Sequence, residues 1–367
     1  MSKKRVLAMF MALAVAAGLT ACGGSADNGS ASAPADTQAP AEESGEETAQ
    51  AEPAGTGESF VIKVGYGTNP GHPIDLGSIK FEEEVEAKAK ELGYDVDVQL
   101  FPSAQLGSEK EMIEQLQMGT LDMCPTTTGP LGLFNSQYLV FDLPYLFLNY
   151  DQADAVLDGE IGTEMLSALE DQNIVGLAWW ENGFRELTNN KKPITKPEDL
   201  NGLKLRTMEN DVHIDFFSAM GASPTPLGFG EIYTSLQSGV IDGQENPLSI
   251  IAVNKFYDVQ PYTTISDHVY SPVPVLYSKS LYEKLPADLQ ELVKTTAYEV
   301  RTYERQSGRD AEQEYIDEIA QKSEIYKLSE EEKAAFREIA LETYSKFEDK
   351  IGKELVDKVT AAVDSVQ

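Results

Sequence analysis

Short apolar strands alternate with amphipathic helices from Phe60 onward, and this alternation limits the possible folds more than any other feature of the chain. In the helical segments apolar residues recur every three or four positions, whereas the segments between them are short and apolar or alternating. Strands are expected at residues 60–64, 94–100, 121–124 and 174–180, and helices at 73–92 and 109–118. Such alternation predicts an α/β fold with a mainly parallel sheet.

A second strand–helix set follows Pro193 and Pro197. Its expected strands are residues 203–206 and 240–242, and its expected helices are residues 213–220 and 231–237. Because each set can form a sheet of its own, the pattern predicts two sheets rather than one.

The chain after Tyr270 is predicted to be mainly helical. Residues 286–322 keep a helical spacing of apolar side chains, and such a helix would extend about 54 Å at 1.5 Å per residue. Ser329 and Glu332 form a capping box that opens a second helix, expected to continue through Leu355. Since 54 Å exceeds the width of one small α/β unit, we expect these helices to brace both sheets.

The N-terminus has the layout of an export signal. Residues 3–5 are basic, and residues 6–19 form an apolar run that is too short to span a bilayer. The run ends in Leu-Thr-Ala-Cys22-Gly, which resembles the lipobox of bacterial lipoproteins. We therefore expect a signal peptide over residues 1–21 and a lipid on Cys22. A plain secretory signal with a chance cysteine is the alternative.

Residues 22–58 are predicted to be a flexible acidic tether, because after Cys22 they contain no apolar residue larger than alanine or proline. A coil of about 36 residues reaches on the order of 30–36 Å. The anchor and tether together predict an extracytoplasmic protein held at the cell membrane. That membrane is either the outer surface of a Gram-positive cell or a membrane facing the periplasm.

Charge and composition exclude several classes of function. The chain has 61 acidic and 29 basic residues and a formal net charge of −32, which would repel phosphate backbones, so nucleic-acid binding is not expected. Two cysteines and three histidines supply neither a disulfide framework nor a metal-ligand spacing. Cys124 is expected to be a packed thiol. Because no nucleophile elbow or phosphate-binding loop occurs either, we predict no enzyme activity, no metal and no cofactor.

Arg206 ends the expected strand Gly202-Leu-Lys-Leu-Arg206, at the edge where open α/β sheets bind ligands. Its guanidinium is a planar fork that matches a carboxylate. An arginine on a solvated strand face is the alternative. Three segments of the chain closely resemble solute-binding proteins of tripartite ATP-independent periplasmic (TRAP) transporters, the DctP family. They are the strand that ends at Arg206, the segment from Gly221 to Pro247 that ends in Asp-Gly-Gln-Glu-Asn-Pro, and residues 101–122.

The resemblance implies which residues bind the ligand. Arg206 falls on the family arginine that forms a two-pronged salt bridge with the ligand carboxylate. Arg185 and Asn246 fall on further carboxylate partners, and Asn246 is also expected to cap a helix that begins at Pro247. Phe229 falls where many relatives place an aromatic wall, and a phenylalanine of the hydrophobic core is the alternative.

Three further pocket residues are expected at positions that differ between relatives: His72, Thr127 and Glu181. An exposed loop histidine is the alternative for His72. The hydroxyl groups of Thr126 to Thr128 suit a small hydroxy or sugar acid, but they would also suit a dicarboxylate.

The resemblance also implies two lobes joined by a hinge, a ligand cleft between them and a long C-terminal helix that crosses both. We expect residues 59–183 and 271–310 in lobe I, and residues 184–270 and 311–367 in lobe II. The implied function is capture of a small organic acid, such as a uronate or aldonate, and its delivery to an ion-gradient-driven TRAP permease. A C4-dicarboxylate or 2-oxo acid ligand and a surface scaffold without a transport role are the alternatives.

Overall fold

The computed structural model describes residues 57–366. The predicted signal peptide, Cys22 and all of the predicted tether except residues 57 and 58 lie outside the described residues. Within residues 57–366, no helix combines the length and the apolar character that crossing a membrane requires.

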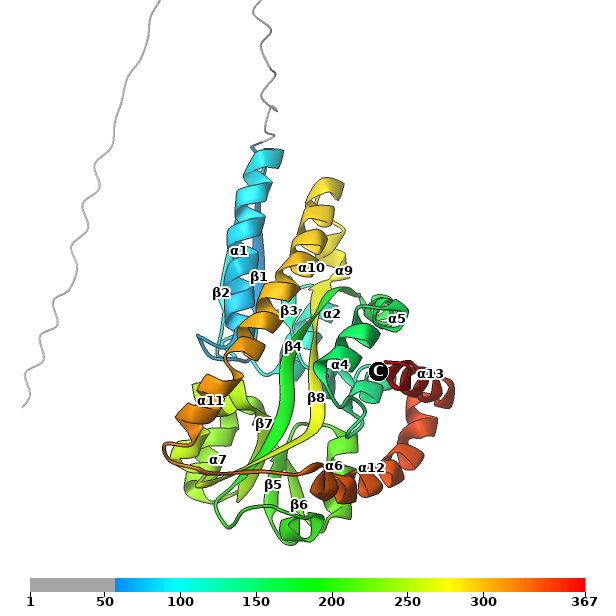
Figure 1. The fold of residues 1–367 in the computed structure, drawn as a ribbon. Coiled ribbons are helices and arrows are strands. Elements are labelled where there is room, and N and C mark those ends of the chain that lie inside the picture. Colours follow the sequence, from blue (N-terminus) through cyan, green and yellow to red (C-terminus); the bar gives the residue numbers. More distant parts are fainter. Residues whose placement is uncertain (1–56, 367) are drawn as a thin grey trace, which may run out of the picture. The chain divides into compact units, whose positions relative to one another are not determined.

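A nine-stranded sheet of mixed strand direction forms the centre of the fold (Figure 1). Its strands are β1 (Ser59–Gly65), β2 (Asp95–Phe101), β3 (Met123–Pro125), β4 (Ile174–Asn189), β5 (Lys204–Thr207), β6 (Ser223–Pro226), β7 (Gly243–Pro247), β8 (Tyr262–Ser278) and β9 (Glu324–Lys327). The strand order is β2-β1-β3-β8-β4-β7-β5-β6, with β9 paired to β8. The β1–β3 set and the β5–β7 set are each parallel, whereas β4 and β8 pair antiparallel between them.

The long strands β4 and β8 join the two strand–helix sets into one sheet, so the prediction of two sheets is wrong. β8 pairs with β3 of the first set, and β4 pairs with β7 of the second. Strand β8 is not among the predicted elements, and its Pro272 and Pro274 are unusual in a central strand. On the side away from β4, β8 pairs only at its two ends, with β9 up to Ile265 and with β3 from Val275, so neither proline must donate a hydrogen bond there.

Helices cover the sheet at both ends. The α-helices are α1 (Pro73–Leu92), α2 (Glu109–Met118), α3 (Thr128–Leu131), α4 (Tyr150–Leu157), α5 (Glu160–Ser167), α6 (Asp211–Ala219), α7 (Ile232–Ser238), α8 (Leu248–Val253), α9 (Lys279–Tyr282), α10 (Ala287–Asp310), α11 (Glu312–Ile319), α12 (Glu330–Ile351) and α13 (Lys353–Asp364). Short 3₁₀ helices are η1 (Ser136–Asp142), η2 (Glu170–Gln172), η3 (Pro197–Leu200), η4 (Phe229–Glu231) and η5 (Phe256–Asp258). We call the β1–β3 end with α1 and α2 the first lobe, and the β5–β7 end with α6 to α8 the second lobe.

The predicted long C-terminal helix is two helices, because the chain turns at Ala311 between α10 and α11. α10 packs on α1 and β4, whereas α11 packs on α8 of the second lobe, so the turn lets one segment contact both lobes (Figure 1). The helix opened by the Ser329 capping box likewise ends earlier than predicted, at Ile351. Gly352, with φ of 108°, separates α12 from α13.

The predicted strand at residues 240–242 is a turn, and β7 begins at Gly243 instead. The apolar side chain of Val240 is more than half exposed, whereas the polar side chains of β7 are buried and hydrogen-bonded to one another and to β4. Asn246 lies within β7 and does not cap a helix; α8 follows Pro247 without a side-chain cap. A search for hydrophobic patterns does not detect β7, because the buried side chains of this strand are polar and hydrogen-bonded rather than apolar.

Candidate functional site

A cavity of about 30 Å³ lies between the two lobes. Five of the seven predicted ligand residues line it, and they come from both lobes: Arg185, Arg206, Asn246, Phe229 and Thr127. A space of this size holds about two water molecules. The structure therefore brings together the two arginines and the asparagine, which lie 61 residues or less apart in sequence but on three different strands.

Arg206 lies near the end of β5, as predicted, and only 3% of its side chain is exposed. Its Nε and Nη2 donate to the carbonyl oxygen of Leu227, at 3.0 and 2.7 Å. Within residues 57–366, no carboxylate forms an ion pair with it. Burial lowers the pKa of Arg206 to about 10, so the group stays charged at neutral pH. A buried guanidinium without a carboxylate partner favours an anionic ligand.

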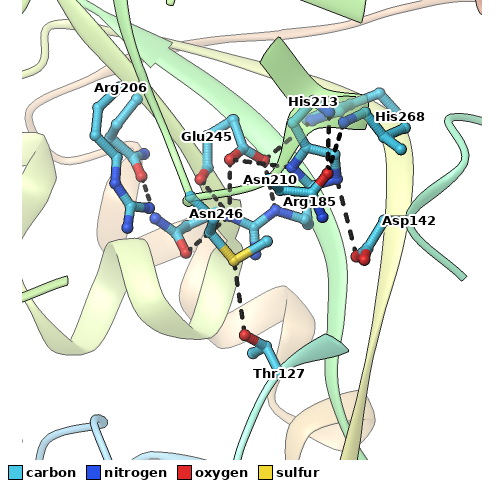
Figure 2. Close-up of polar contacts among 12 residues, drawn as sticks. Thr127, Asp142, Arg185, Arg206, Asn210, His213, Glu245, Asn246 and His268 are labelled. Atoms are coloured by element: carbon cyan, nitrogen blue, oxygen red, sulfur yellow. Dashed lines mark hydrogen bonds and ion pairs between the residues drawn. The ribbon is translucent and has the colours of Figure 1, made fainter. Parts of the chain in front are cut away.

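Arg185 lies on β4 and is neutralised by the protein itself. Its Nε and Nη2 donate to the Glu245 carboxylate, and Nη2 also donates to the backbone oxygen of Glu245 at 2.7 Å (Figure 2). Burial raises the pKa of Glu245, but the Arg185 guanidinium outweighs this effect and holds that pKa well below its ordinary value. Of the two arginines in the cavity, only Arg206 therefore lacks an ion-pair partner among the described residues. The Nη1 atom of Arg185 is buried and has no hydrogen-bond partner among the described residues.

Two histidines pack behind the Arg185–Glu245 pair. His268 Nε2 lies 3.3 Å from Glu245 Oε2, and its Nδ1 lies 2.8 Å from Ser266 Oγ. His213 lies 4.0 Å from both Glu245 and Asp142 (Figure 2). Burial lowers the pKa of His213 to about 3 and raises the pKa of Asp142 to about 7. These buried residues pack around Glu245, the ion-pair partner of Arg185, and none of them lines the cavity.

The other cavity residues have defined partners. Asn246 Oδ1 accepts from Arg185 Nη2 at 3.2 Å, and its Nδ2 donates to Gln244 Oε1 at 2.5 Å. Phe229 begins η4 and contributes an apolar wall. Thr127 donates its hydroxyl to Glu109 rather than leaving it free in the cavity.

The structure places the remaining two predicted residues elsewhere. Glu181 accepts from Tyr270 and from Arg309, and it lines a second cavity of about 250 Å³. His72 is the N-cap of α1, with Nδ1 accepting from the Ile74 N–H and Nε2 lying 3.0 Å from Ser249 Oγ of the second lobe. His72 is buried at the lobe interface and does not line either cavity.

The larger cavity does not suit an anion. Four acidic side chains line it, Glu181, Glu186, Asp267 and Glu312, against one cationic lining residue among those described, Lys327. Burial raises the pKa of Glu312, and the negative charge of Asp267 raises it further. The smaller cavity with Arg206 is therefore the candidate ligand site.

Sequence reasoning missed three polar residues of the smaller cavity: Glu109, Thr68 and Asn182. Glu109 is the first residue of α2, where an acidic side chain ordinarily indicates only favourable helix-dipole placement. Asn182 lies three residues before Arg185 on β4, but nothing in its sequence context distinguishes a ligand-binding asparagine from a structural one.

The burial of His72 predicts a specific pH dependence of stability. Burial lowers its pKa to about 3, so the folded protein keeps His72 neutral, while the unfolded chain takes up a proton below about pH 6.5. The free energy of unfolding should therefore fall as the pH drops from 6.5 towards 3, by up to about 1.4 kcal/mol per pH unit for this residue.

His72→Asn tests this effect, because asparagine caps a helix but does not titrate. Between about pH 7 and pH 5, its free energy of unfolding should change by about 2 kcal/mol less than that of the unaltered protein. Urea unfolding at the two pH values measures the difference. Equal pH dependence in both proteins would mean that the folded state accommodates a charged His72.

Comparison with known proteins identifies the family. The sequence pattern of bacterial extracellular solute-binding proteins of family 7, DctP, matches residues 64–350. The chain belongs to the DctP family. The resemblance stated from the sequence is therefore confirmed, and with it the mixed α/β, two-lobe fold of solute-binding proteins.

Individual relatives bind different acids. The chain is 36% identical to the C4-dicarboxylate-binding periplasmic protein DctP of Rhodobacter capsulatus, over 83% of this chain and 91% of that protein. It is 34% identical, with a TM-score of 0.82, to the crystal structure of the sugar acid binding protein DctPAm of Advenella mimigardefordensis with galactonate, covering 85% of this chain and all of that one. A TRAP periplasmic solute-binding protein of a Polaromonas species, bound to D-erythronate, shares 36% identity and a TM-score of 0.79, covering 82% and 98%.

These comparisons bear on the scaffold alternative considered from the sequence. The DctP family consists of bacterial extracellular solute-binding proteins, so a scaffold role is not needed to explain the fold. Within the described residues, no group of three or more His, Cys, Asp or Glu side chains is placed to hold a metal ion. Cys124 is fully buried, and burial raises the pKa of its thiol well above the ordinary value, as a packed cysteine requires.

Proposed function

We propose that this protein captures a small organic acid by its carboxylate and delivers it to the permease of a TRAP transporter. The observation that carries the proposal is Arg206, a buried guanidinium that faces the cavity between the lobes and has no ion-pair partner among the described residues. A carboxylate of the ligand supplies the missing partner, with Arg185 Nη1 as a further donor. Asn246 lies beside both and completes the carboxylate site.

The contacts between the lobes support capture by hinge closure. Across the cleft, Asn69 Nδ2 donates to Asn254 Oδ1 at 2.7 Å, and His72 lies 3.0 Å from Ser249. A cavity of about 30 Å³ is smaller than any sugar acid, so the lobes must separate for a ligand to enter. A carboxylate that touches both lobes binds the closed state better and shifts the population towards it.

We keep the predicted lobe boundaries as part of this proposal, with lobe I as residues 59–183 and 271–310 and lobe II as residues 184–270 and 311–367. One observation favours an exception. Three valines of α13, Val356, Val359 and Val363, belong to the same buried cluster as residues of α2, α4 and α5. α13 should therefore move with lobe I.

The ligand is proposed to be a hydroxy or sugar acid such as a uronate or aldonate, with a C4-dicarboxylate or a 2-oxo acid as the alternative. Thermal melting of the purified protein against each class tests the proposal. A ligand at about 1,000 times its dissociation constant adds about 4 kcal/mol and raises the melting temperature by several degrees. A shift with one class of acid and none with neutral sugars is expected. No shift with any acid would reject the proposal.

We further propose that Cys22 carries a lipid that holds the protein at the outer face of a Gram-positive membrane or in the periplasm. The lipobox-like residues 19–22 and the acidic segment that follows support this anchor. Mass spectrometry of the N-terminal peptide from membranes tests it. A diacylglyceryl group on Cys22 is expected, and a mature chain that lacks Cys22 would reject the anchor.

A further inference from the structure

The charges that line the ligand cavity are unevenly distributed. Its two cationic side chains, Arg185 and Arg206, lie in β4 and β5, on the carboxylate side of the site. One acidic side chain lines the cavity, Glu109 of the first lobe, and no further cation does so among the described residues. Arg206 can therefore bind one negatively charged group of the ligand, and the wall of the cavity also contains the acidic side chain of Glu109.

Glu109 is held in position by the end of β3. Its Oε1 accepts from the Thr127 N–H at 2.8 Å and from Thr126 Oγ1 at 3.2 Å, and its Oε2 accepts from Thr127 Oγ1 at 3.0 Å. An ionised carboxylate accepts about four hydrogen bonds, so one acceptor position remains. Because every partner donates to it, the group acts as an acceptor and has a fixed orientation. Glu109 can therefore bind a ligand group that donates a hydrogen bond.

Two other cavity residues have polar atoms without partners. The hydroxyl of Thr68 and Oδ1 of Asn182 are buried and make no hydrogen bond within the part of the chain that the structure describes. Both residues line the same cavity, and they are 7% and 8% exposed. Buried polar atoms are normally paired, so the Thr68 hydroxyl indicates that the ligand supplies a partner. The Asn182 side chain lies beside His72 and also lines the larger cavity, so it contributes to this wall without requiring a ligand partner. A ligand hydroxyl can both accept from Thr68 and donate to Glu109 or Asn182, whereas an ammonium group can only donate.

We infer that Glu109, Thr68 and Asn182 form a hydroxyl-binding subsite that selects monocarboxylates with hydroxyl groups and rejects dicarboxylates. This inference rests on the proposed function, because it takes the first carboxylate to be bound at Arg206. A second carboxylate on the ligand would add a negative charge to a cavity that already contains Glu109 and is lined by no cation besides Arg185 and Arg206 among the described residues, and like charges juxtaposed in a binding site oppose association. The family includes both acid classes, and this subsite decides between them for this chain.

Two pairs of acids that differ only in their last carbon test the subsite. Galactonate and erythronate end in a hydroxymethyl group, whereas galactarate and meso-tartrate carry a second carboxylate in its place. Isothermal titration of the purified protein should show at least about 100-fold weaker binding of each diacid than of its matched monoacid. Equal affinities, or tighter binding of 4-amino-3-hydroxybutanoate than of erythronate, would overturn the hydroxyl assignment.

Glu109→Gln removes the charge but keeps the size of the side chain. It should weaken the binding of monoacids about 10-fold and strengthen the binding of diacids about 10-fold, so that the ratio of the two affinities falls about 100-fold. Glu83→Gln, an exposed change of equal charge on α1, is the matched control and should leave all affinities unchanged. An unchanged selectivity in Glu109→Gln would reject the subsite. If the unaltered protein shows no selectivity for monoacids but Arg206→Met abolishes binding of every acid, the subsite is rejected and the proposed function stands.

Discussion

Arg206→Met is expected to weaken the binding of a monocarboxylate by a factor of about 100 or more. Loss of one partner from a buried, hydrogen-bonded charge pair ordinarily costs about 2–5 kcal/mol of binding free energy. In this protein the other partner is the ligand itself, because the Arg206 guanidinium donates to the carbonyl of Leu227 but forms no ion pair within residues 57–366. Isothermal titration with the best acid of the panel measures the loss.

The same substitution should leave the fold intact. Methionine removes a buried charge that forms no ion pair in the described part of the protein, and it gives up only the two hydrogen bonds to Leu227. The free energy of unfolding should therefore change by less than about 1 kcal/mol. Lys204→Met, on the same strand with an exposed side chain, is the control and should retain binding. Full affinity in Arg206→Met would contradict the assigned role.

Arg206→Lys separates the charge of this side chain from its shape. Lysine keeps a positive charge but cannot offer two parallel donors to a carboxylate. Its affinity should fall between that of the unaltered protein and that of Arg206→Met. An affinity equal to that of arginine would mean that charge alone holds the ligand.

Glu245→Gln is expected to lower the free energy of unfolding by about 3–5 kcal/mol, because it leaves the Arg185 guanidinium buried without its counter-charge. Both side chains are fully buried, and Glu245 is also the partner of His268. Urea unfolding at neutral pH measures the change. This large effect contrasts with the small one expected at Arg206, although both arginines line the same cavity.

A double-variant cycle tests whether the pair acts as a unit. Arg185→Met and Glu245→Leu should each cost about as much as Glu245→Gln, whereas the double variant that combines Arg185→Met with Glu245→Leu should cost less than either of these single changes. Apolar residues of similar volume can replace a buried ion pair at little cost, but not half of one. Strictly additive effects would show that Arg185 and Glu245 do not depend on each other.

The elements of residues 59–118 could be predicted from the sequence, whereas α3, η1, α4 and α5 were not predicted. β1, β2, α1 and α2 follow apolar periodicity, and their bounds agree with the expected ranges to within about two residues. β7 and β8 could not be predicted in the same way. β7 buries Gln244, Glu245 and Asn246 in hydrogen bonds with partners far away in sequence, and β8 contains two prolines that only its local strand pairing allows.

Arg206 could be proposed as a site residue from the sequence because a strand-end guanidinium suits a carboxylate, and it lines the cavity. The resemblance to the DctP family, rather than the residue type, favoured this role over that of an arginine on a solvated strand face. The difference between Arg185 and Arg206 could not be predicted, since it depends on Glu245, which lies 60 residues beyond Arg185. Glu181 and His72 lie outside the cavity because Arg309 holds the first and the start of α1 holds the second. Glu109 reaches the cavity only because Thr126 and Thr127 hold it there.

A crystal structure of the protein with the acid that binds most tightly tests the central claim most directly. We predict that both carboxylate oxygens lie within about 3 Å of Arg206 guanidinium nitrogens, with Arg185 Nη1 and Asn246 close by. A carboxylate bound away from Arg206, for example beside Lys327 in the larger cavity, would contradict the account.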